Sequence, residues 1–332
     1  MGEYMRLAIA VDVGATNLRV ALGDEEGRLL KKLVERTTRV GDEYAVANQI
    51  VSMIRRLVSA SELERVVAIG VGTIGPLDIK RGRVVKAPNL PFEVIELGAP
   101  LHELLKRPVY ILNDCVAAVW GEKVFGAGKN VRNLVYVTIS TGIGAGVIVD
   151  DVLLLGKDGN AHEVGHTVVD IAGTMVCGCG KRGHWEAYCS GANIPKFARY
   201  LMDNMPPEVI SRSKLYGAYV RGELSAELVY SAAKEGDEVA LKIVEEIGRI
   251  NAIGFANIVS TYDPELITVG GSVVLKNPEL TIPYIRKYIH EYTVNRVPEI
   301  ILTPLGEDAV LYGALATALR PPETLLRLIQ YT

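Results

Sequence analysis

The sequence predicts an α/β protein built from two related halves. Apolar strands alternate with stretches of helical periodicity, a pattern typical of α/β folds. A meander of three short apolar strands occurs twice, once near the N-terminus and once from residue 134 onward. The length of 332 residues is sufficient for two domains of ordinary size, each with its own buried core.

The first meander covers residues 7–36. The apolar runs LAIAVDVGA, LRVALGDEEG and LLKKLVER are separated by turn residues, which predicts three antiparallel strands. Apolar residues at helical spacing predict a helix over 43–59, and two buried strands are expected at 65–70 and 109–112. A helix is expected from about Asp114.

The second meander consists of LVYVTISTG, IGAGVIVDD and VLLLGK. Further along, Asp237 is predicted to cap a long helix that ends near residues 262–264. A strand over 266–269 then runs into a Gly-Gly-Ser turn and another helix, and the last predicted helix covers 309–319. In both meanders the first strand ends in a polar, Gly-rich turn, which indicates a duplication, although chance similarity between two β-meanders would give the same pattern.

Charge and composition exclude several classes of partner. The formal net charge of −3 and pI near 6.0 leave no basic field for nucleic acid. The N-terminus MGEYMRLAIAVD lacks the pattern of a secretory signal, and no apolar run reaches membrane-spanning length. We therefore expect a cytoplasmic protein that acts on small molecules. Glutamine occurs only at 49 and 330 alongside abundant charged and β-branched residues, a balance often found in heat-stable proteins from thermophiles.

The two turns after the meanders' first strands are candidate phosphate sites. Their backbone N–H groups and hydroxyls could hold the phosphates of a nucleotide, while Asp12 helps to position Mg²⁺. Either turn alone needs no ligand, because Gly-rich hairpins are common. The run from Gly142 is not a dinucleotide fingerprint, since Val147 stands where the spacing requires glycine and a strand follows. Neither a Walker A loop nor a protein-kinase signature is present.

Asn113 and Asp114 fall where a buried strand gives way to a helix. A carboxylate at the carboxyl end of a strand could take a proton from a substrate hydroxyl, with the adjacent amide fixing that hydroxyl. The alternative is that these residues only cap the helix, which Asn and Asp often do. Asn89, within Pro-Asn-Leu-Pro, is by itself an ordinary loop residue.

The segment CGCGKRGHWE holds two of the four cysteines and one of the five histidines. With one further histidine it offers two thiolates and two imidazoles for a closed, structural Zn²⁺ site: His166, Cys177, Cys179 and His184. A redox CxC pair and unpaired thiols are the competing interpretations. An ordered metal loop would also hold Glu186, two residues beyond the last ligand, which otherwise is a solvent-facing acid at a helix start.

Taken together, these stretches resemble the ROK family of the hexokinase and actin-like superfamily, over essentially the whole chain. The matching segments are DVGATN at 12–17, APNLP at 87–91, ILNDCVAA at 111–118, STGIGAG at 140–146, HEVGH at 162–166, CGCGKRGHWE at 177–186 and DPELITVGGSV at 263–273. The resemblance implies two ribonuclease-H-like domains with mixed sheets and a cleft between them. We expect domains at 1–113 with a C-terminal helix in 308–332, and at 114–307 with the zinc loop.

The resemblance also implies roles for individual residues. Those expected to face ATP and its phosphates are Asp12, Gly14, Thr16, Asn17, Thr141, Gly142, Gly270 and Gly271. Those expected to bind sugar hydroxyls are Asn89, Asn113, Asp114, Glu163, His166 and Glu186. Asp114 would be the general base, and His166 would contact the sugar through one ring nitrogen and zinc through the other.

Three departures from the family pattern affect these expectations. His184 stands in place of a third loop cysteine, which exchanges one thiolate for an imidazole. His162 replaces a residue that is usually small, next to Glu163. Ala15 and Asn17 stand where glycine and a lysine-like residue are usual, which leaves the detailed phosphate contacts open.

The sequence is thus interpreted as that of an ATP-dependent hexose kinase, a glucokinase or broad hexokinase, that forms a homodimer or tetramer. A fructose, mannose or N-acetylhexosamine kinase is the near alternative, since the quoted residues contact hydroxyls common to many hexoses. A sugar-responsive regulator would need an N-terminal DNA-binding module, and the first strand begins too early to leave room for one. An actin-like ATPase would need neither the sugar residues nor the zinc loop.

Overall fold

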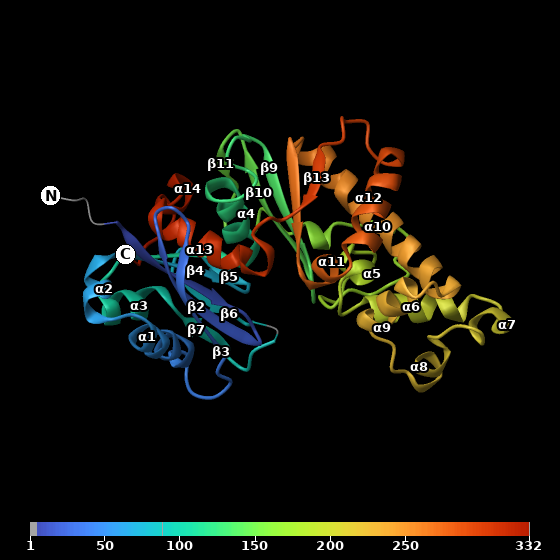
Figure 1. Ribbon diagram of the computed structural model, residues 1–332, viewed down its shortest axis with the longest axis horizontal. Coiled ribbons are helices and arrows are strands. Elements are labelled where there is room, and N and C mark those ends of the chain that lie inside the picture. The colour runs from blue at the N-terminus through green and yellow to red at the C-terminus, as the bar shows by residue number, and fades with distance from the viewer. Residues whose placement is uncertain (1–4, 88, 332) are drawn as a thin grey trace. The chain divides into compact units, whose positions relative to one another are not determined.

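The computed structural model describes residues 5–87 and 89–331, and it confirms the α/β fold class (Figure 1). Pro88, in the APNLP segment, lies outside the described residues. β1 is buried along its whole length, as expected of a central strand. The first sheet has the order β3-β2-β1-β4-β8, with β1, β2 and β3 antiparallel and β1, β4 and β8 parallel. Its strands are β1 (Leu7–Val13), β2 (Asn17–Asp24), β3 (Leu29–Arg36), β4 (Val66–Thr73) and β8 (Val109–Asn113).

The second sheet repeats this arrangement. Its order, β11-β10-β9-β12-β13, again places the third, second, first, fourth and fifth strands of the half side by side. Its strands are β9 (Leu134–Ile139), β10 (Ile143–Val149), β11 (Val152–Leu153), β12 (Leu266–Gly270) and β13 (Glu299–Leu302). The duplication indicated by the sequence pattern is therefore also a duplication of topology. A small third sheet contains β5 (Leu77–Asp78), β6 (Arg83–Val85) and β7 (Val94–Glu96).

The helices of the first half follow the prediction except at one boundary. The helix predicted over 43–59 ends at residue 57, because Ser59 starts a new helix as its N-cap and forms a capping box with Glu62. The helices are α1 (Ala45–Leu57), α2 (Ala60–Arg65), α3 (Gly98–Leu105) and α4 (Asp114–Val124).

The long helix of the second half begins and ends as predicted. Asp237 caps it by accepting from the Ala240 N–H over 2.9 Å, and Asp263 ends it in the left-handed conformation. The predicted helix 309–319 has those bounds, but a short further helix follows it, so it is not the last. The α-helices are α5 (Glu186–Cys189), α6 (Ile194–Asp203), α7 (Pro207–Ile210), α8 (Tyr216–Arg221), α9 (Ala226–Lys234), α10 (Glu238–Tyr262), α11 (Ser272–Lys276), α12 (Ile282–Tyr288), α13 (Ala309–Leu319) and α14 (Glu323–Leu326). The 3₁₀ helices are η1 (Val164–His166), η2 (Pro278–Leu280), η3 (Ile289–Glu291) and η4 (Gly306–Asp308).

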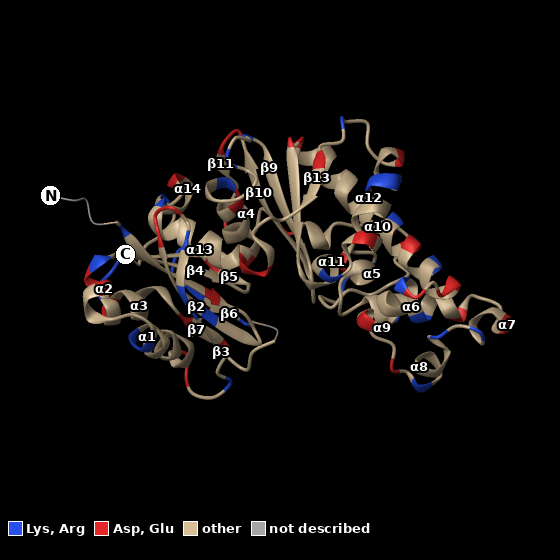
Figure 2. Ribbon diagram, in the orientation of Figure 1, with Lys and Arg blue, Asp and Glu red and all other residues tan. Residues whose placement is uncertain are grey.

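By its contacts the chain divides into two compact units. Unit 1 contains the described residues up to 136, 146–162 and those from 303 onward; unit 2 contains 137–145 and 163–302. In the described part of the chain, Lys, Arg, Asp and Glu are dispersed over both units, and the view in Figure 2 shows no continuous band of either sign. Among the described residues, no helix combines the length and hydropathy needed to cross a lipid bilayer.

Helix α4 belongs to unit 1, whereas the sequence analysis placed it in the second domain, from residue 114 onward. The reason is its close packing against α13. A Cβ atom on Gly313 would lie 1.9 Å from the Ala117 carbonyl oxygen, so the two helix backbones meet where no side chain fits. The approach of α13 to β4 is equally close, because a Cβ atom on Gly70 would lie 1.8 Å from the Ala314 carbonyl oxygen. These contacts fix α4, and with it the end of β8, against the first sheet.

Candidate active site

Asp12 lies at the carboxyl end of β1 and is largely buried. The antiparallel register places it directly opposite Arg19 of β2, and Arg19 Nη1 donates to Asp12 Oδ2 over 3.0 Å. Burial raises the pKa of Asp12 to about 6; Arg19 counteracts this rise, while the nearby charges of Asp114 and Asp308 add to it. The end of β1 therefore presents a carboxylate next to one cation and two further acids.

The turn that joins β1 to β2 is held by its own backbone. The Gly14 N–H donates to the Asn17 carbonyl over 3.0 Å, and Thr37 donates from its hydroxyl to the Gly14 carbonyl and from its N–H to the Thr16 carbonyl. A Cβ at Gly14 would lie 2.8 Å from the Asn17 carbonyl oxygen, which favours glycine there. Thr16 and Asn17 are exposed, so their side chains are available to a ligand.

Asn113 and Asp114 lie at the end of β8, two strands from β1. Asn113 caps α4 by accepting from the Cys115 N–H over 3.0 Å, and Asp114 Oδ1 accepts from the same N–H over 2.8 Å. The capping role considered from the sequence is therefore real. Asp114 is only half-buried and lies near enough to raise the pKa of Asp12 by its charge, so capping does not remove it from the site.

Asn89 lies in an exposed loop of the same unit. Its backbone carbonyl accepts from Arg39 Nη1 over 3.0 Å. The structure thus places Asp114 near enough to affect the charge of Asp12, whereas Asn89 lies on an exposed loop that contacts Arg39.

The turn between β9 and β10 is the counterpart of the β1–β2 turn. The Ser140 N–H donates to the Gly142 carbonyl over 2.9 Å, and the carbonyls of Ser140 and Thr141 accept from the N–H groups of Gly191 and Ala192. Thr141 is exposed. This turn offers hydroxyl and backbone groups but no charged side chain.

Beside this turn, unit 2 contains a cavity of about 540 Å³, a size typical of small-molecule sites. Its wall is formed by the β9–β10 turn, the segment before α6, helix α9 and helix α11. The lining residues are Ser140, Thr141, Gly191, Ala192, Ala226, Glu227, Tyr230, Ser231, Lys234, Ser272, Val273, Lys276 and Asn277.

Gly271 closes the end of β12 next to this cavity. Its φ of +89° lies in the region that glycine adopts freely, and a Cβ there would lie 2.4 Å from the Ile139 carbonyl oxygen. The Gly270-Gly271 pair singled out from the sequence therefore allows β12 to run past the end of β9 and into α11, which supplies part of the cavity wall.

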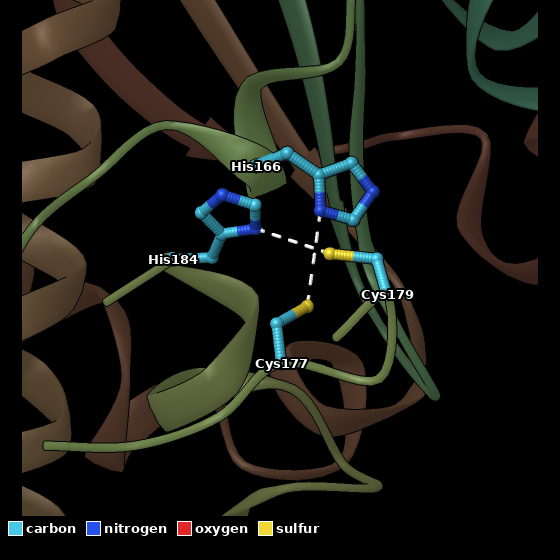
Figure 3. Close-up of side chains that lie close together, drawn as sticks. All are labelled: His166, Cys177, Cys179 and His184. Carbon is cyan, nitrogen blue, oxygen red and sulfur yellow. Dashed lines mark hydrogen bonds between the residues drawn. The ribbon is translucent and has the colours of Figure 1, made fainter. Parts of the chain in front are cut away.

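The four predicted metal ligands come together in unit 2 (Figure 3). Their donor atoms all lie within 4.8 Å of one another, and among the described residues no other group of His, Cys, Asp and Glu was found to be arranged in this way. Cys177 Sγ lies 3.8 Å from His166 Nδ1, and Cys179 Sγ lies 3.3 Å from His184 Nδ1. Burial raises the pKa of Cys177 to about 12 and lowers that of His184, so both of these groups favour their neutral forms.

Both imidazoles direct Nδ1 toward the cluster, as Figure 3 shows. The other nitrogen of His166, Nε2, lies 3.7 Å from Glu163 Oε2. Glu163 and His166 are both partly exposed. The ring of His166 thus separates the cysteine pair from a carboxylate that solvent or a ligand can reach.

Glu186 links the cluster to the β9–β10 turn. Its Oε1 accepts from the Cys177 thiol over 3.5 Å, and its Oε2 accepts from the Ile143 N–H over 2.9 Å. A Cβ at Gly142 would lie 2.8 Å from the same Oε2 atom. One carboxylate therefore touches both the metal loop and the candidate phosphate turn.

Helix α10 holds the metal loop in place through Trp185, which is fully buried. Its indole N–H donates to Asn251 Oδ1 over 2.8 Å, and its ring packs so closely on Gly254 that a Cβ there would lie 2.3 Å from it. Since Trp185 stands between His184 and Glu186, this contact positions a candidate metal ligand and the linking carboxylate together. His162 has a different role: it is buried and pins its own loop by a 2.8 Å contact between Nε2 and the Gly159 carbonyl.

Two parts of the site were not predicted from the sequence. Arg19 was overlooked, although alternation along β2 and the β1–β2 hairpin register place it opposite Asp12. Helix α9 was not assigned to any site, and no motif in its sequence indicates that it lines a cavity.

Comparisons with a family model, with curated proteins and with solved structures all lead to the ROK family. The model of the ROK family matches residues 8–320. A glucokinase of Pyrobaculum calidifontis is 41% identical over 98% of both chains. Among solved structures, a ROK hexokinase from Thermus thermophilus is 30% identical with a TM-score of 0.77, covering 94% of this chain and 98% of that one. A ROK family glucokinase from Streptomyces griseus, in complex with glucose and AMPPNP, is 33% identical with a TM-score of 0.75, covering 95% and 99%.

Proposed function

The chain belongs to the ROK family, and from that premise we propose that it is an ATP-dependent kinase that phosphorylates the 6-hydroxyl of glucose or of a range of hexoses. The observation that carries the proposal is that Asp12 and Asp114 lie close enough for the charge of one to affect the pKa of the other, at the carboxyl ends of two parallel strands, β1 and β8, that flank β4. Open α/β sheets bind their ligands at such strand ends. One carboxylate suits a nucleotide-bound metal and the other suits a substrate hydroxyl.

Asp114 acts as the general base. It takes the proton of the 6-hydroxyl as that oxygen forms a bond to the γ-phosphorus of ATP, and the bond from that phosphorus to the β–γ bridging oxygen breaks, releasing ADP. Asn113, fixed by its cap bond, orients the same hydroxyl. Asp114 is half-buried, which suits it to act as the base. Its carboxylate remains accessible, and the hydrogen bond from the Cys115 N–H fixes the direction of the side chain.

Unit 2 binds the nucleotide. The adenosine occupies the cavity beside the β9–β10 turn, and Thr141 and Gly142 contact the phosphates with hydroxyl and backbone groups. Asp12, Gly14, Thr16 and Asn17, at the β1–β2 turn of unit 1, are the other residues assigned to nucleotide phosphates. The Asp12 carboxylate offers the oxygen donors that Mg²⁺ prefers, and an Mg²⁺ ion held there would offset phosphate charge during transfer.

The sugar hydroxyls are bound by Glu163, His166 and Glu186, together with Asn89, Asn113 and Asp114. Zn²⁺ fits the cluster, because two thiolates and two imidazoles with mutually close donor atoms match a closed tetrahedral site. A zinc ion bound by these four side chains would supply rigidity, not hydrolytic chemistry. Through Nδ1 of His166 it would fix the ring so that Nε2 can contact the sugar.

The test is ADP release from Mg-ATP in the presence of glucose, fructose, mannose, galactose, N-acetylglucosamine or N-acetylmannosamine, with a no-sugar control. Sugar-dependent release would establish the kinase and rank the substrates, including the fructose, mannose and N-acetylhexosamine alternatives. Release that does not depend on sugar would instead indicate an ATPase. No release with any sugar would reject the proposal for these hexoses.

Three expectations extend beyond the site. The protein acts in the cytoplasm, it forms a homodimer or tetramer, and it is heat-stable. Cell fractionation, multi-angle light scattering and a thermal melt respectively check them.

A further inference from the structure

Arg19 is the only Lys or Arg between residues 7 and 27, and its guanidinium faces the buried carboxylate of Asp12. We propose that Arg19 is a positioning residue that holds Asp12 and offsets the negative charge around it, so that a magnesium-bound nucleoside triphosphate can dock at the β1–β2 turn. The inference deepens the proposed function and rests on it.

The geometry fixes the guanidinium on two sides. Arg19 Nη1 lies 3.0 Å from Asp12 Oδ2 and 3.4 Å from the backbone carbonyl oxygen of Glu307 in η4. Both partners belong to unit 1. The Arg19 side chain is 28% exposed and that of Asp12 is 10% exposed, so the ion pair is largely shielded from water. Charge-assisted hydrogen bonds in such a setting hold a carboxylate in one orientation.

The charge balance shows why the site needs this arginine. Asp12, Asp114 and Asp308 lie close enough for the latter two to affect the pKa of the first, and Lys32 pairs with Asp308 over 2.7 Å on the exposed side. A magnesium-bound triphosphate is itself an anion, which uncompensated carboxylates would repel. The flanking residues on the same face of β2, Asn17 and Ala21, are both uncharged. Arg19 is therefore the cation that allows the acids to hold a metal without rejecting the nucleotide.

The experiment compares Arg19→Met and Arg19→Lys with wild type. The control is Lys31→Met, which removes a cation of the neighbouring strand from an exposed pair with Glu62. Calorimetry without sugar measures the Kd of a non-hydrolysable ATP analogue in the presence of Mg²⁺, and steady-state assays measure KM for ATP and for the sugar. A melting curve establishes that each variant folds.

We expect Arg19→Met to raise the Kd for the analogue and the KM for Mg-ATP by about 10-fold or more, while the KM for sugar stays near wild type. Arg19→Lys should recover part of the loss, and Lys31→Met should change neither constant. If Arg19→Met does not fold, Arg19→Gln decides the question, because a Kd equal to that of wild type in a variant without the cation would overturn the role.

Two results separate this inference from the proposed function. Wild-type protein that binds no magnesium nucleotide would reject both. Wild-type protein that binds it, with Arg19→Met binding equally well or losing nucleotide and sugar affinity to the same extent, would overturn the positioning role alone.

Discussion

The two sheets have the same strand order but end in different chemistry. In the first half, the turn after the leading strand is flanked by Asp12 and Arg19, and the fifth strand runs into Asn113 and Asp114. In the second half, the equivalent turn consists of Ser140, Thr141 and Gly142, and the fifth strand runs into Thr303. The comparison shows that the repeated fold places loops at equivalent points of the two sheets. The side chains in those loops differ, with charged groups in the first half and hydroxyl groups and glycine in the second.

The second half also has more chain between its meander and its fourth strand. Residues 154–265 stand there, against 37–65 in the first half. This longer segment contains the metal loop and helices α5–α10. It adds a walled cavity and a cysteine and histidine cluster to a turn that is otherwise an uncharged hairpin. The candidate binding groups of the second half therefore lie largely in this longer segment, whereas Asp12 and Arg19 of the first half lie on the sheet itself.

The largest effect is expected from Asp114→Asn, which removes the carboxylate that follows the fifth strand of the first sheet. As a general base, Asp114 should account for a ~10² to 10⁴-fold change in kcat, since the amide cannot accept the proton. Steady-state kinetics with saturating Mg-ATP and sugar measures it.

Asp151→Asn is the matched control, because this exposed carboxylate pairs only at the surface with Lys123 and Arg132. It should leave kcat unchanged. A near-normal kcat for Asp114→Asn would show that Asp114 only caps helix α4 and is not the general base.

The second prediction concerns the metal loop. Cys177→Ser should lose stoichiometric zinc and lower kcat/KM for the sugar by ~10-fold or more, because His166 would no longer be fixed through Nδ1. Metal analysis and kinetics measure the two effects. The adjacent, exposed Val176→Ala should change neither. Freshly purified wild-type protein without stoichiometric zinc would contradict the account of the cluster.

The third prediction tests how tightly the second sheet is built around its cavity. Gly271→Ala combines a positive φ with a methyl group 2.4 Å from the Ile139 carbonyl oxygen. It should lower the free energy of unfolding by ~2 kcal/mol or more and weaken nucleotide binding. Gly236→Ala has a φ of +79° but nothing within 4 Å of the added Cβ, so it isolates the backbone cost. Equal urea denaturation of the two variants would exclude the steric contribution.

The smallest effect concerns the sheet edges. At the first edge, Tyr331 accepts at its hydroxyl from the Ile111 N–H of β8 over 3.2 Å; at the second edge, Arg286 donates to the Ile300 carbonyl of β13. Tyr331→Phe should cost about 1 kcal/mol and accelerate hydrogen exchange at Ile111. The exposed Tyr44→Phe serves as control. Unchanged exchange would mean that this edge needs no hydroxyl cap.

Much of the fold could be predicted from local signals. The strands could be predicted from apolar runs, and α10 could be predicted from its N-cap Asp237 and its helical periodicity. The break at Ser59 could have been recognised from its capping box with Glu62, but continuing apolar spacing hid it. The grouping of α4 with unit 1 could not be predicted, because it depends on Gly121 and Gly313 meeting across distant segments.

The site was predictable where its residues are close in sequence or carry distinctive chemistry. The four metal ligands and the Asn113-Asp114 pair are of this kind, and the structure places the ligands together. The contribution of α9 was not predictable, because Glu227, Tyr230 and Lys234 are ordinary helix residues until the fold brings them beside Thr141. The link from Glu186 to the Ile143 N–H is likewise a tertiary contact without a sequence signal.

The most direct test of the central claim is to identify the product. The protein is incubated with Mg-ATP and ¹³C-labelled glucose, and the products are followed by ³¹P and ¹³C NMR. The account predicts a phosphate ester at carbon 6, formed in equal amount with ADP and requiring both substrates. ADP without a sugar ester, or an ester at another carbon, would contradict it.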